Sequence, residues 1–249
     1  MSRVISVVTP VYDGGTEFLP EAYESVRAER ERLPNGWDLQ WLVQEDGMTG
    51  RPITTIPDEP WISAGMGTRN GAGAARTMAL PRAVGDLVRA LDADDVILPG
   101  GLVREITAME EHPGAGWCVS AGLDLLSDGS TVAGPYDPPE GPLTYDALLR
   151  AYDADVFPVL AQHLTVRKSL LLAVGAWPTL PAWETIATVL CCAAVSDGWM
   201  ISTPGGIYRK HPGQTTARAD YAEVADLAQL RIIVRAQAEA LRASGWRWP

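Results

Sequence analysis

The sequence predicts an α/β fold in which helices flank a mostly parallel central sheet, followed by a smaller C-terminal lobe. Through the first half of the chain, short hydrophobic runs alternate with helical patterns of apolar residues, which is typical of βαβ units. The chain has 249 residues, of which 47% are hydrophobic and 20% charged. That is enough for one large core, or for one domain with an appended lobe.

The N-terminal half is predicted to begin with a strand, a helix and a strand. Residues 4–9 and 39–43 form apolar runs of strand length. Between them, apolar side chains recur with helical spacing, at Leu19, Ala22, Tyr23, Val26 and Leu33. This helix is expected to stop before Pro34, because the Pro-Asn-Gly segment that starts there favours a turn.

Residues 61–111 continue the alternation of predicted strands and helices. A short strand is predicted at 61–64 and a helix at 72–84, interrupted by Pro81. A buried strand at 87–91 then leads directly into four residues, Asp-Ala-Asp-Asp, at 92–95. Pro99 and Gly100 follow and are expected to open a helix that continues through Glu111. Carboxylates are thus expected to cluster at the carboxyl end of a strand.

The second half has a less regular pattern. A loop rich in proline and glycine at 134–142 is predicted to mark a lobe boundary. The remaining expected elements are strands at 117–122, 164–167 and 199–201, a turn at 127–129, and helices at 145–152, 184–196 and 221–243.

The charge of the chain disfavours a nucleic-acid partner. Aspartate and glutamate number 31 against 20 lysines and arginines, so the net charge is −11 and a track for nucleic-acid phosphates is not expected. Any phosphate that binds here would need the help of a cation. The three cysteines, Cys118, Cys191 and Cys192, are expected to be reduced and mostly buried thiols.

The apolar segments are too short for a leader or a membrane anchor. Residues 4–11 lack the length and the cleavage site of a signal peptide. The longest other apolar patch, 189–195, falls far below the roughly 18 residues that a bilayer crossing needs. We therefore expect no transmembrane segment and a cytoplasmic protein.

Polar side chains follow three of the predicted strands. The first strand ends in Thr-Pro-Val-Tyr-Asp, the second in Glu-Asp-Gly and the fourth in Asp-Ala-Asp-Asp. In an open α/β sheet, ligands bind outside the carboxyl ends of the strands. The ring of Tyr12 can stack on a nucleobase, and carboxylates can accept hydrogen bonds from a base or a ribose. Repulsion among the acids at 92–95 means that they could hold a diphosphate only through a hard divalent cation, Mg²⁺ or Mn²⁺.

These motifs, taken in order, resemble the GT-A-fold glycosyltransferases of family 2, which use nucleotide-sugars. The resemblance is closest over roughly the first 110 residues and is scattered to about residue 216. It implies a GT-A fold with a Rossmann-like sheet. The segments that carry it are 6–12 (SVVTPVY), 45–47 (EDG), Asn70 with Ala75 and Arg76, 91–95 (LDADD) with Pro99 and Gly100, and 208–213 (YRKHPG).

The resemblance also implies roles for individual residues. Asp46 would contact the base, Asp92 the ribose, and Asp94 a metal ion together with the diphosphate. His211 would approach the metal or the diphosphate from the second lobe. The nucleotide-sugar-binding set implied in this way is Thr9, Pro10, Tyr12, Asp13, Asp46, Asn70, Arg76, Asp92, Ala93 and Asp94.

On the acceptor side, the resemblance aligns Glu184 with the family's late acidic pair and makes it the candidate general base; Trp183 beside it is a candidate acceptor contact. The expected reaction is metal-dependent, inverting transfer of a sugar from a nucleotide-sugar to a hydroxyl of a small or soluble acceptor, and the resemblance alone favours a UDP-sugar. Attack opposite the leaving group needs one carboxylate to take the proton and no enzyme nucleophile. The division expected is a nucleotide-sugar-binding half at 1–115, an acceptor-binding and catalytic half at 116–216, and a C-terminal helix at 217–249.

Two departures from the family pattern leave an alternative open. Glu45 and Met48 replace the commoner aspartate and serine of the second acidic turn, and Thr185 replaces the second acid near Glu184. A nucleotide-sugar-binding protein that has lost its base is therefore the second hypothesis.

The proposed site residues also have purely structural interpretations. The acids at 92–95 could cap a helix, and Asp46 could be a turn residue. Glu184 could complement a helix dipole, and His211 could be an ordinary loop residue.

Overall fold

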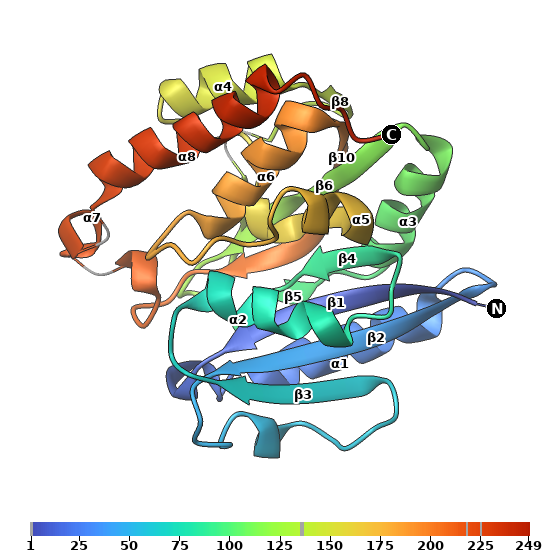
Figure 1. Ribbon diagram of the computed structural model, residues 1–249. Coiled ribbons are helices and arrows are strands. Elements are labelled where there is room, and N and C mark those ends of the chain that lie inside the picture. The colour runs from blue at the N-terminus through green and yellow to red at the C-terminus, as the bar shows by residue number, and fades with distance from the viewer. Residues whose placement is uncertain (1, 135–136, 218, 225) are drawn as a thin grey trace.

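A ten-stranded sheet runs through the molecule, with helices on both faces (Figure 1). The computed structural model describes residues 2–134, 137–217, 219–224 and 226–249. The strands are β1 (Arg3–Val11), β2 (Trp37–Asp46), β3 (Ile62–Gly67), β4 (Leu87–Ala90), β5 (Val96–Ile97), β6 (Ala115–Leu125), β7 (Thr131–Ala133), β8 (Gly141–Leu143), β9 (Leu164–Arg167) and β10 (Asp197–Arg209).

The helices are α1 (Leu19–Arg32), α2 (Ala72–Ala79), α3 (Gly101–Glu111), α4 (Tyr145–Asp153), α5 (Lys168–Ala173), α6 (Glu184–Val195), α7 (Tyr221–Val224) and α8 (Leu227–Ala243). Short 3₁₀ turns lie at Asp13–Gly15, Ile53–Thr55, Leu80–Arg82, Ala161–His163 and Thr215–Ala217.

The strand order is β3-β2-β1-β4-β9-β6-β10-β5, with β7 on β6 and β8 on β10. The pairs among β3, β2, β1 and β4 are parallel, as is the pair of β6 with β10, whereas β9 is antiparallel to both of its neighbours. Because β1 has β2 on one side and β4 on the other, the strand order reverses beside β1. Ligands of open α/β sheets bind at such a switch point.

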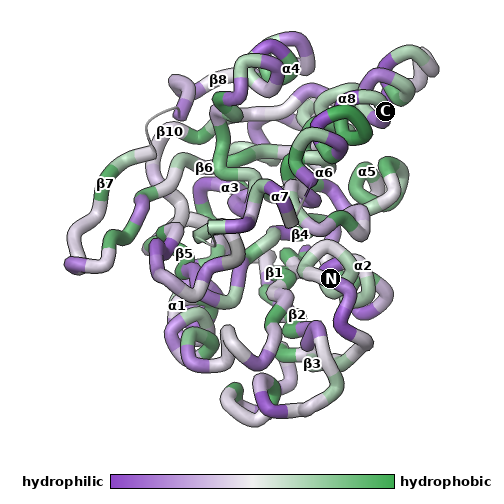
Figure 2. The backbone as a smooth tube through the Cα atoms, turned by 90° about the vertical axis from the view of Figure 1, so that its left-hand side faces the viewer, coloured by the Kyte–Doolittle hydropathy of each residue, from purple (hydrophilic) through white to green (hydrophobic). Residues whose placement is uncertain are grey.

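The core lies on both faces of the sheet. In β1, Ile5 and Val7 pack toward α1 and α3, whereas Val8 faces the cluster that contains α6. Strands buried on both faces are nearly continuous in apolar residues, which explains why β1 and β4 were predictable. Figure 2 shows apolar residues concentrated on the central strands and on α6, while outer turns of α1 and α4 are hydrophilic.

The predicted α/β class is confirmed, and β9 has the predicted bounds. The strand expected at 199–201 is wrong in length, because β10 has 13 residues. Its later part is held by pairing with β6 and β5 rather than by an apolar run of its own. The helix expected at 72–84 ends as an α-helix at Ala79, and a 3₁₀ turn that contains Pro81 follows.

Other differences are small elements. The sequence did not predict α5, β5 or β7, and β8 occupies the end of the loop expected at 134–142, of which residues 135–136 lie outside the described residues. The helix expected at 221–243 is α7 and α8, with residue 225 outside the described part. Asp226, with φ of 47°, caps α8 through Gln229 N–H.

The three cysteines are free and buried, as expected. Within the described residues, no helix combines the length and the hydropathy needed to cross a membrane. Strands from both sides of the expected boundary at residue 115 belong to the same sheet.

Candidate active site

A cavity of about 620 Å³ opens at the carboxyl ends of β1, β2 and β4. Of the residues that the sequence singled out, the cavity is lined by Pro10, Tyr12, Asp46, Asn70, Arg76, Asp92, Ala93, Asp94, Trp183, Glu184 and His211. The fold thus brings together segments that lie far apart in the sequence, because parallel strands end on the same edge of the sheet.

Thr9 and Asp13 do not line this cavity. Thr9 is fully buried, and its hydroxyl accepts a hydrogen bond of 2.9 Å from the Trp41 indole N–H. The Asp13 carboxylate accepts a hydrogen bond of 2.5 Å from the Thr49 hydroxyl and lies 3.8 Å from Arg51. Thr9 therefore links β1 to β2, whereas Asp13 links the segment after β1 to the segment after β2.

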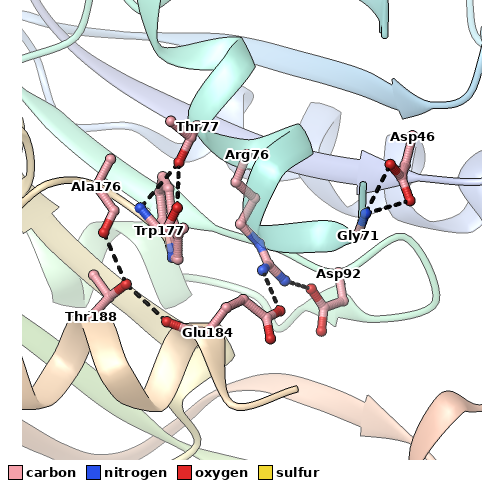
Figure 3. Close-up of polar contacts among 9 residues, drawn as sticks. All are labelled: Asp46, Gly71, Arg76, Thr77, Asp92, Ala176, Trp177, Glu184 and Thr188. Atoms are coloured by element: carbon pink, nitrogen blue, oxygen red, sulfur yellow. Dashed lines mark hydrogen bonds and ion pairs between the residues drawn. The ribbon is translucent and has the colours of Figure 1, made fainter. Parts of the chain in front are cut away.

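Asp46 holds the loop that precedes α2. Its carboxylate accepts a hydrogen bond from the backbone N–H of Asn70 at 2.7 Å. It also accepts from the backbone N–H of Gly71 at 3.1 Å (Figure 3). Gly71 is the N-cap residue of α2, with φ of 91°, so Asp46 places a negative charge where the helix dipole favours it. The structural role weighed for Asp46 is therefore present, and the residue still lines the cavity.

Tyr12 and Arg69 form one side of the cavity. Tyr12 is 38% exposed, and its ring packs against Gly14, where an added Cβ would lie 2.4 Å from the ring. The guanidinium carbon of Arg69 lies 5.4 Å from the centroid of the same ring. Sequence reasoning missed Arg69; its place one residue before Asn70 was the available signal.

Arg76 joins the two halves of the site. It is 1% exposed, and it donates to Asp92 Oδ1 through Nη2 and to Glu184 Oε1 through Nη1, the latter at 2.9 Å (Figure 3). Burial disfavours the charged guanidinium, yet the carboxylates of Asp92 and Glu184 outweigh it, and the pKa of Arg76 is raised. Glu184 is the first residue of α6, so it both begins a helix and lines the cavity.

Asp94 meets His211 from the other half of the chain. Asp94 Oδ2 lies 3.0 Å from His211 Nε2, and the Phe18 ring packs against the imidazole at a centroid distance of 4.7 Å. Burial and the negative charge of Asp92 raise the pKa of Asp94 above its ordinary value, although His211 opposes this.

Asp95 and Arg209 support the acidic segment from beneath. Asp95 is 1% exposed; its Oδ1 accepts from the backbone N–H of Arg209 at 3.0 Å, and its Oδ2 has no partner among the described residues. Burial, and then the charges of Asp92 and Asp94, raise the pKa of Asp95 well above its ordinary value. The Arg209 side chain donates through Nε to the carbonyl of Asp94 at 2.9 Å. Asp95 was expected only as one of the acids at 92–95, and Arg209 was assigned no role, although it lies within the segment 208–213.

The acidic segment fits a hard divalent cation. One carboxylate oxygen from each of Asp92, Asp94 and Asp95 lies within 4.8 Å of the others. Oxygen donors of this kind are those that Mg²⁺ and Mn²⁺ prefer. The unpartnered Oδ2 of Asp95 and the crowding of like charges are the features that a cation would relieve.

Trp183 lies beside Glu184 on the cavity wall. Its backbone has φ of 62°, and its ring makes an edge contact with Tyr152 at 5.9 Å between centroids. Thr185, the departure from the family pattern, is buried and also lines the cavity.

Comparison with solved structures confirms the expected GT-A architecture. The structure of S. aureus TarS 1–349 in complex with UDP-GlcNAc matches with a TM-score of 0.70 and 19% identity, covering 98% of this chain and 71% of that chain. S. aureus TarS 1–349 without that ligand matches with a TM-score of 0.68 and 19% identity, covering 98% and 70%.

The sequence comparisons match a family model but no individual curated protein. No curated protein matches the sequence significantly. Residues 6–132, slightly more than half of the chain, match the family described as glycosyl transferase family 2. The chain therefore belongs to glycosyl transferase family 2 and is a glycosyltransferase.

Proposed function

We propose that this glycosyltransferase moves a sugar from a nucleotide-sugar, with a UDP-sugar favoured, to an acceptor hydroxyl with inversion and with the help of Mn²⁺ or Mg²⁺. The observation that carries the proposal is the ion-pair link of Asp92, Arg76 and Glu184. Through it the acidic segment and the candidate base share one cavity. The solved complex of TarS with UDP-GlcNAc supports the choice of a UDP-sugar.

The donor would lie along the edge of the sheet. Tyr12, Asp46 and Asp92 line the cavity. The base would stack on Tyr12 and donate to Asp46, and Asp92 would accept from ribose hydroxyls. Asp94 and His211 would hold the cation. A bound divalent cation would neutralise the charge of the departing diphosphate. Arg76 keeps the Asp92 and Glu184 side chains oriented, since each accepts one of its hydrogen bonds.

Glu184 would take the proton of the acceptor hydroxyl. Arg76 occupies Oε1 of this carboxylate. Among the described residues, no hydrogen-bond donor reaches Oε2, which leaves that oxygen for the acceptor. A single displacement needs one general base and no enzyme nucleophile, which is consistent with a threonine at 185.

Cation and nucleotide binding can be tested with two histidines that each precede a Pro-Gly pair, His211 and His112. The His112 ring stacks on the Trp199 ring, with 3.5 Å between the centroids, and His112 does not line the cavity. His211→Ala should reduce the stabilisation by UDP that requires Mn²⁺, whereas His112→Ala should preserve it. The measurement is the melting-temperature shift with UDP, with and without Mn²⁺. Equal UDP shifts with and without Mn²⁺ in the wild-type protein would contradict metal-assisted binding.

Glu184→Gln separates the enzyme from the alternative binding protein. Transfer and donor hydrolysis should fall at least about 10²-fold, while the dissociation constant for UDP with Mn²⁺ stays within about twofold. Glu223→Gln, at an exposed position of α7, is the matched control and should keep full activity. Unchanged turnover in Glu184→Gln would assign the base to another group.

The division at residues 115 and 216 and a cytoplasmic location also belong to this proposal. Residues 1–115 would bind the donor, 116–216 would bind the acceptor, and 217–249 would form the C-terminal helical part. Three buried free thiols are compatible with a reducing compartment.

A further inference from the structure

The two sides of the cavity differ in how many charged side chains they carry. The donor side carries Asp46, Asp92 and Asp94 together with the cations Arg69 and Arg76. On the opposite side, the wall formed by residues 180–186 and Tyr221 carries one charged side chain, Glu184. Among the described residues of that wall there is no lysine or arginine. Glu184 is also the residue that would take the proton of the acceptor hydroxyl.

The same wall is apolar and firmly supported. Leu180, Trp183 and Tyr221 line the cavity and pack on a small cluster that includes Leu227 and Leu230 of α8. The wall is thus built jointly by the segment before α6 and by the C-terminal helices, which lie side by side in Figure 1. Small-molecule sites commonly combine such apolar walls with a few polar groups that set orientation. Here Gln162, Thr185 and Glu184 supply those polar groups.

We infer that the acceptor is an uncharged hydroxyl compound that lays an aromatic or aliphatic group against the wall formed by Leu180, Trp183 and Tyr221. This inference rests on the proposed function and specifies the class of its acceptor. A phosphate or carboxylate on the acceptor would meet the Glu184 carboxylate in a chain of net charge −11. The guanidinium of Arg76 beside Glu184 is 1% exposed and already pairs with Asp92 and Glu184, and the described residues of the wall itself include no lysine or arginine. An unpaired charge in a partly buried site is costly, whereas an apolar group gains by leaving water.

The reaction that follows balances in one step. The acceptor oxygen forms a bond to the anomeric carbon of the donor as the bond from that carbon to the diphosphate oxygen breaks. The electron pair leaves with the nucleoside diphosphate, and the hydroxyl proton passes to Glu184. The apolar wall takes no part in the bond changes; it positions the body of the acceptor.

Four probes that share a glucose ring test this inference. Binding of phenyl, n-octyl and methyl β-D-glucoside and of glucose 6-phosphate is measured by calorimetry on the full chain, saturated with UDP and Mn²⁺. The phenyl or the octyl glucoside should bind at least tenfold more tightly than the methyl glucoside. Whichever of the two binds more tightly identifies an aromatic or an aliphatic acceptor group. Glucose 6-phosphate should bind more weakly than the methyl glucoside. Equal affinities, no binding of the phenyl and octyl glucosides, or tightest binding of glucose 6-phosphate would each overturn the inference.

Substitutions test whether the preference for apolar glucosides arises at this wall. Trp183→Ala should remove the tenfold preference for the apolar glucosides and leave the dissociation constant for UDP within twofold. Ile233→Ala, at an exposed apolar position of α8 outside the cavity, is the matched control and should keep the preference. Pro181→Arg places a cation on the exposed edge of the wall and should strengthen glucose 6-phosphate binding several-fold. The assignment of this wall would be refuted if the preference for the apolar glucosides survived Trp183→Ala and Pro181→Arg left the binding of glucose 6-phosphate unchanged.

Failure of the inference can be told apart from failure of the proposed function. If UDP binds with Mn²⁺ but the apolar glucosides show no preference, only the acceptor class is wrong. If UDP and Mn²⁺ do not bind together, the proposed function itself fails.

Discussion

Replacing Arg76 by methionine removes the buried cation between Asp92 and Glu184 while keeping most of the apolar stem. Two charge-assisted hydrogen bonds are lost, each contributing about 1.5–3 kcal/mol in favourable cases. The Asp92 side chain is 29% exposed and that of Glu184 16%, so water partly replaces the guanidinium and the lower end applies. We expect a loss of about 3 kcal/mol in the free energy of unfolding. For a chain of this size that corresponds to a melting temperature lower by about 6–12 °C.

Urea unfolding followed by circular dichroism measures this loss, and Arg27→Met is the matched control. Arg27 also pairs with two carboxylates, Glu24 at 2.6 Å and Glu31 at 3.2 Å, but its side chain is 45% exposed. Exposed pairs contribute little, so Arg27→Met should cost much less than Arg76→Met. If Arg76→Met costs no more than Arg27→Met, the buried link does not stabilise the fold, and the reasoning is refuted.

Three further outcomes are expected. Gly73→Ala should cost about 1–3 kcal/mol in unfolding free energy, because its Cβ would lie 2.3 Å from the Pro178 carbonyl oxygen. Gly114→Ala, with no atom within 4 Å of the added Cβ, should cost less than about 0.5 kcal/mol by the same urea assay. Burial, then Arg89, lowers the pKa of His163 to about 3, so the folded state keeps this imidazole neutral while the unfolded state binds a proton below about pH 6.5. Above about pH 7 the titration of His163 therefore does not reduce the free energy of unfolding, and by pH 5 it lowers that free energy by about 2 kcal/mol. His163→Gln should show a correspondingly smaller loss in urea titrations at the two pH values, and an identical loss would contradict the assignment. Chelation of divalent cations by EDTA should abolish the UDP-dependent shift in melting temperature, and added Mn²⁺ should restore it; a shift that persists in EDTA would show that the nucleotide binds without metal.

The strands and helices that could be predicted are those with a local pattern. Residues 5–11 are buried without interruption in β1, and α1 presents Leu19, Ala22 and Val26 on its buried face. Such periodicities can be recognised in the amino-acid sequence because each element buries its own apolar residues. By contrast, β5 has two residues, and within the described part of the chain β10 is its one partner strand, so its existence depends on residues more than a hundred positions away.

The membership of the acidic motifs in one site was foreseeable as well. Strand ends of a parallel sheet meet on one edge, which places Asp46, Asp92 and Asp94 around one cavity. The exclusion of Thr9 and Asp13 from the cavity lining was not foreseeable. It depends on hydrogen bonds from Trp41 and Thr49, and no spacing in the sequence indicates which partner a polar side chain will find.

The amino-acid sequence alone was sufficient to predict the α/β class, the family and the acidic residues at the strand ends, because these depend on periodicity and on motifs of a few residues. The ion pairs across the site depended on folding: Arg76 and Glu184 are 108 positions apart, and Asp94 and His211 are 117 apart. The apolar wall of the cavity likewise joins residues 180–183 to the C-terminal helices. Contacts of this range are set by how helices pack on the sheet, and packing is a property of the whole core rather than of any one segment.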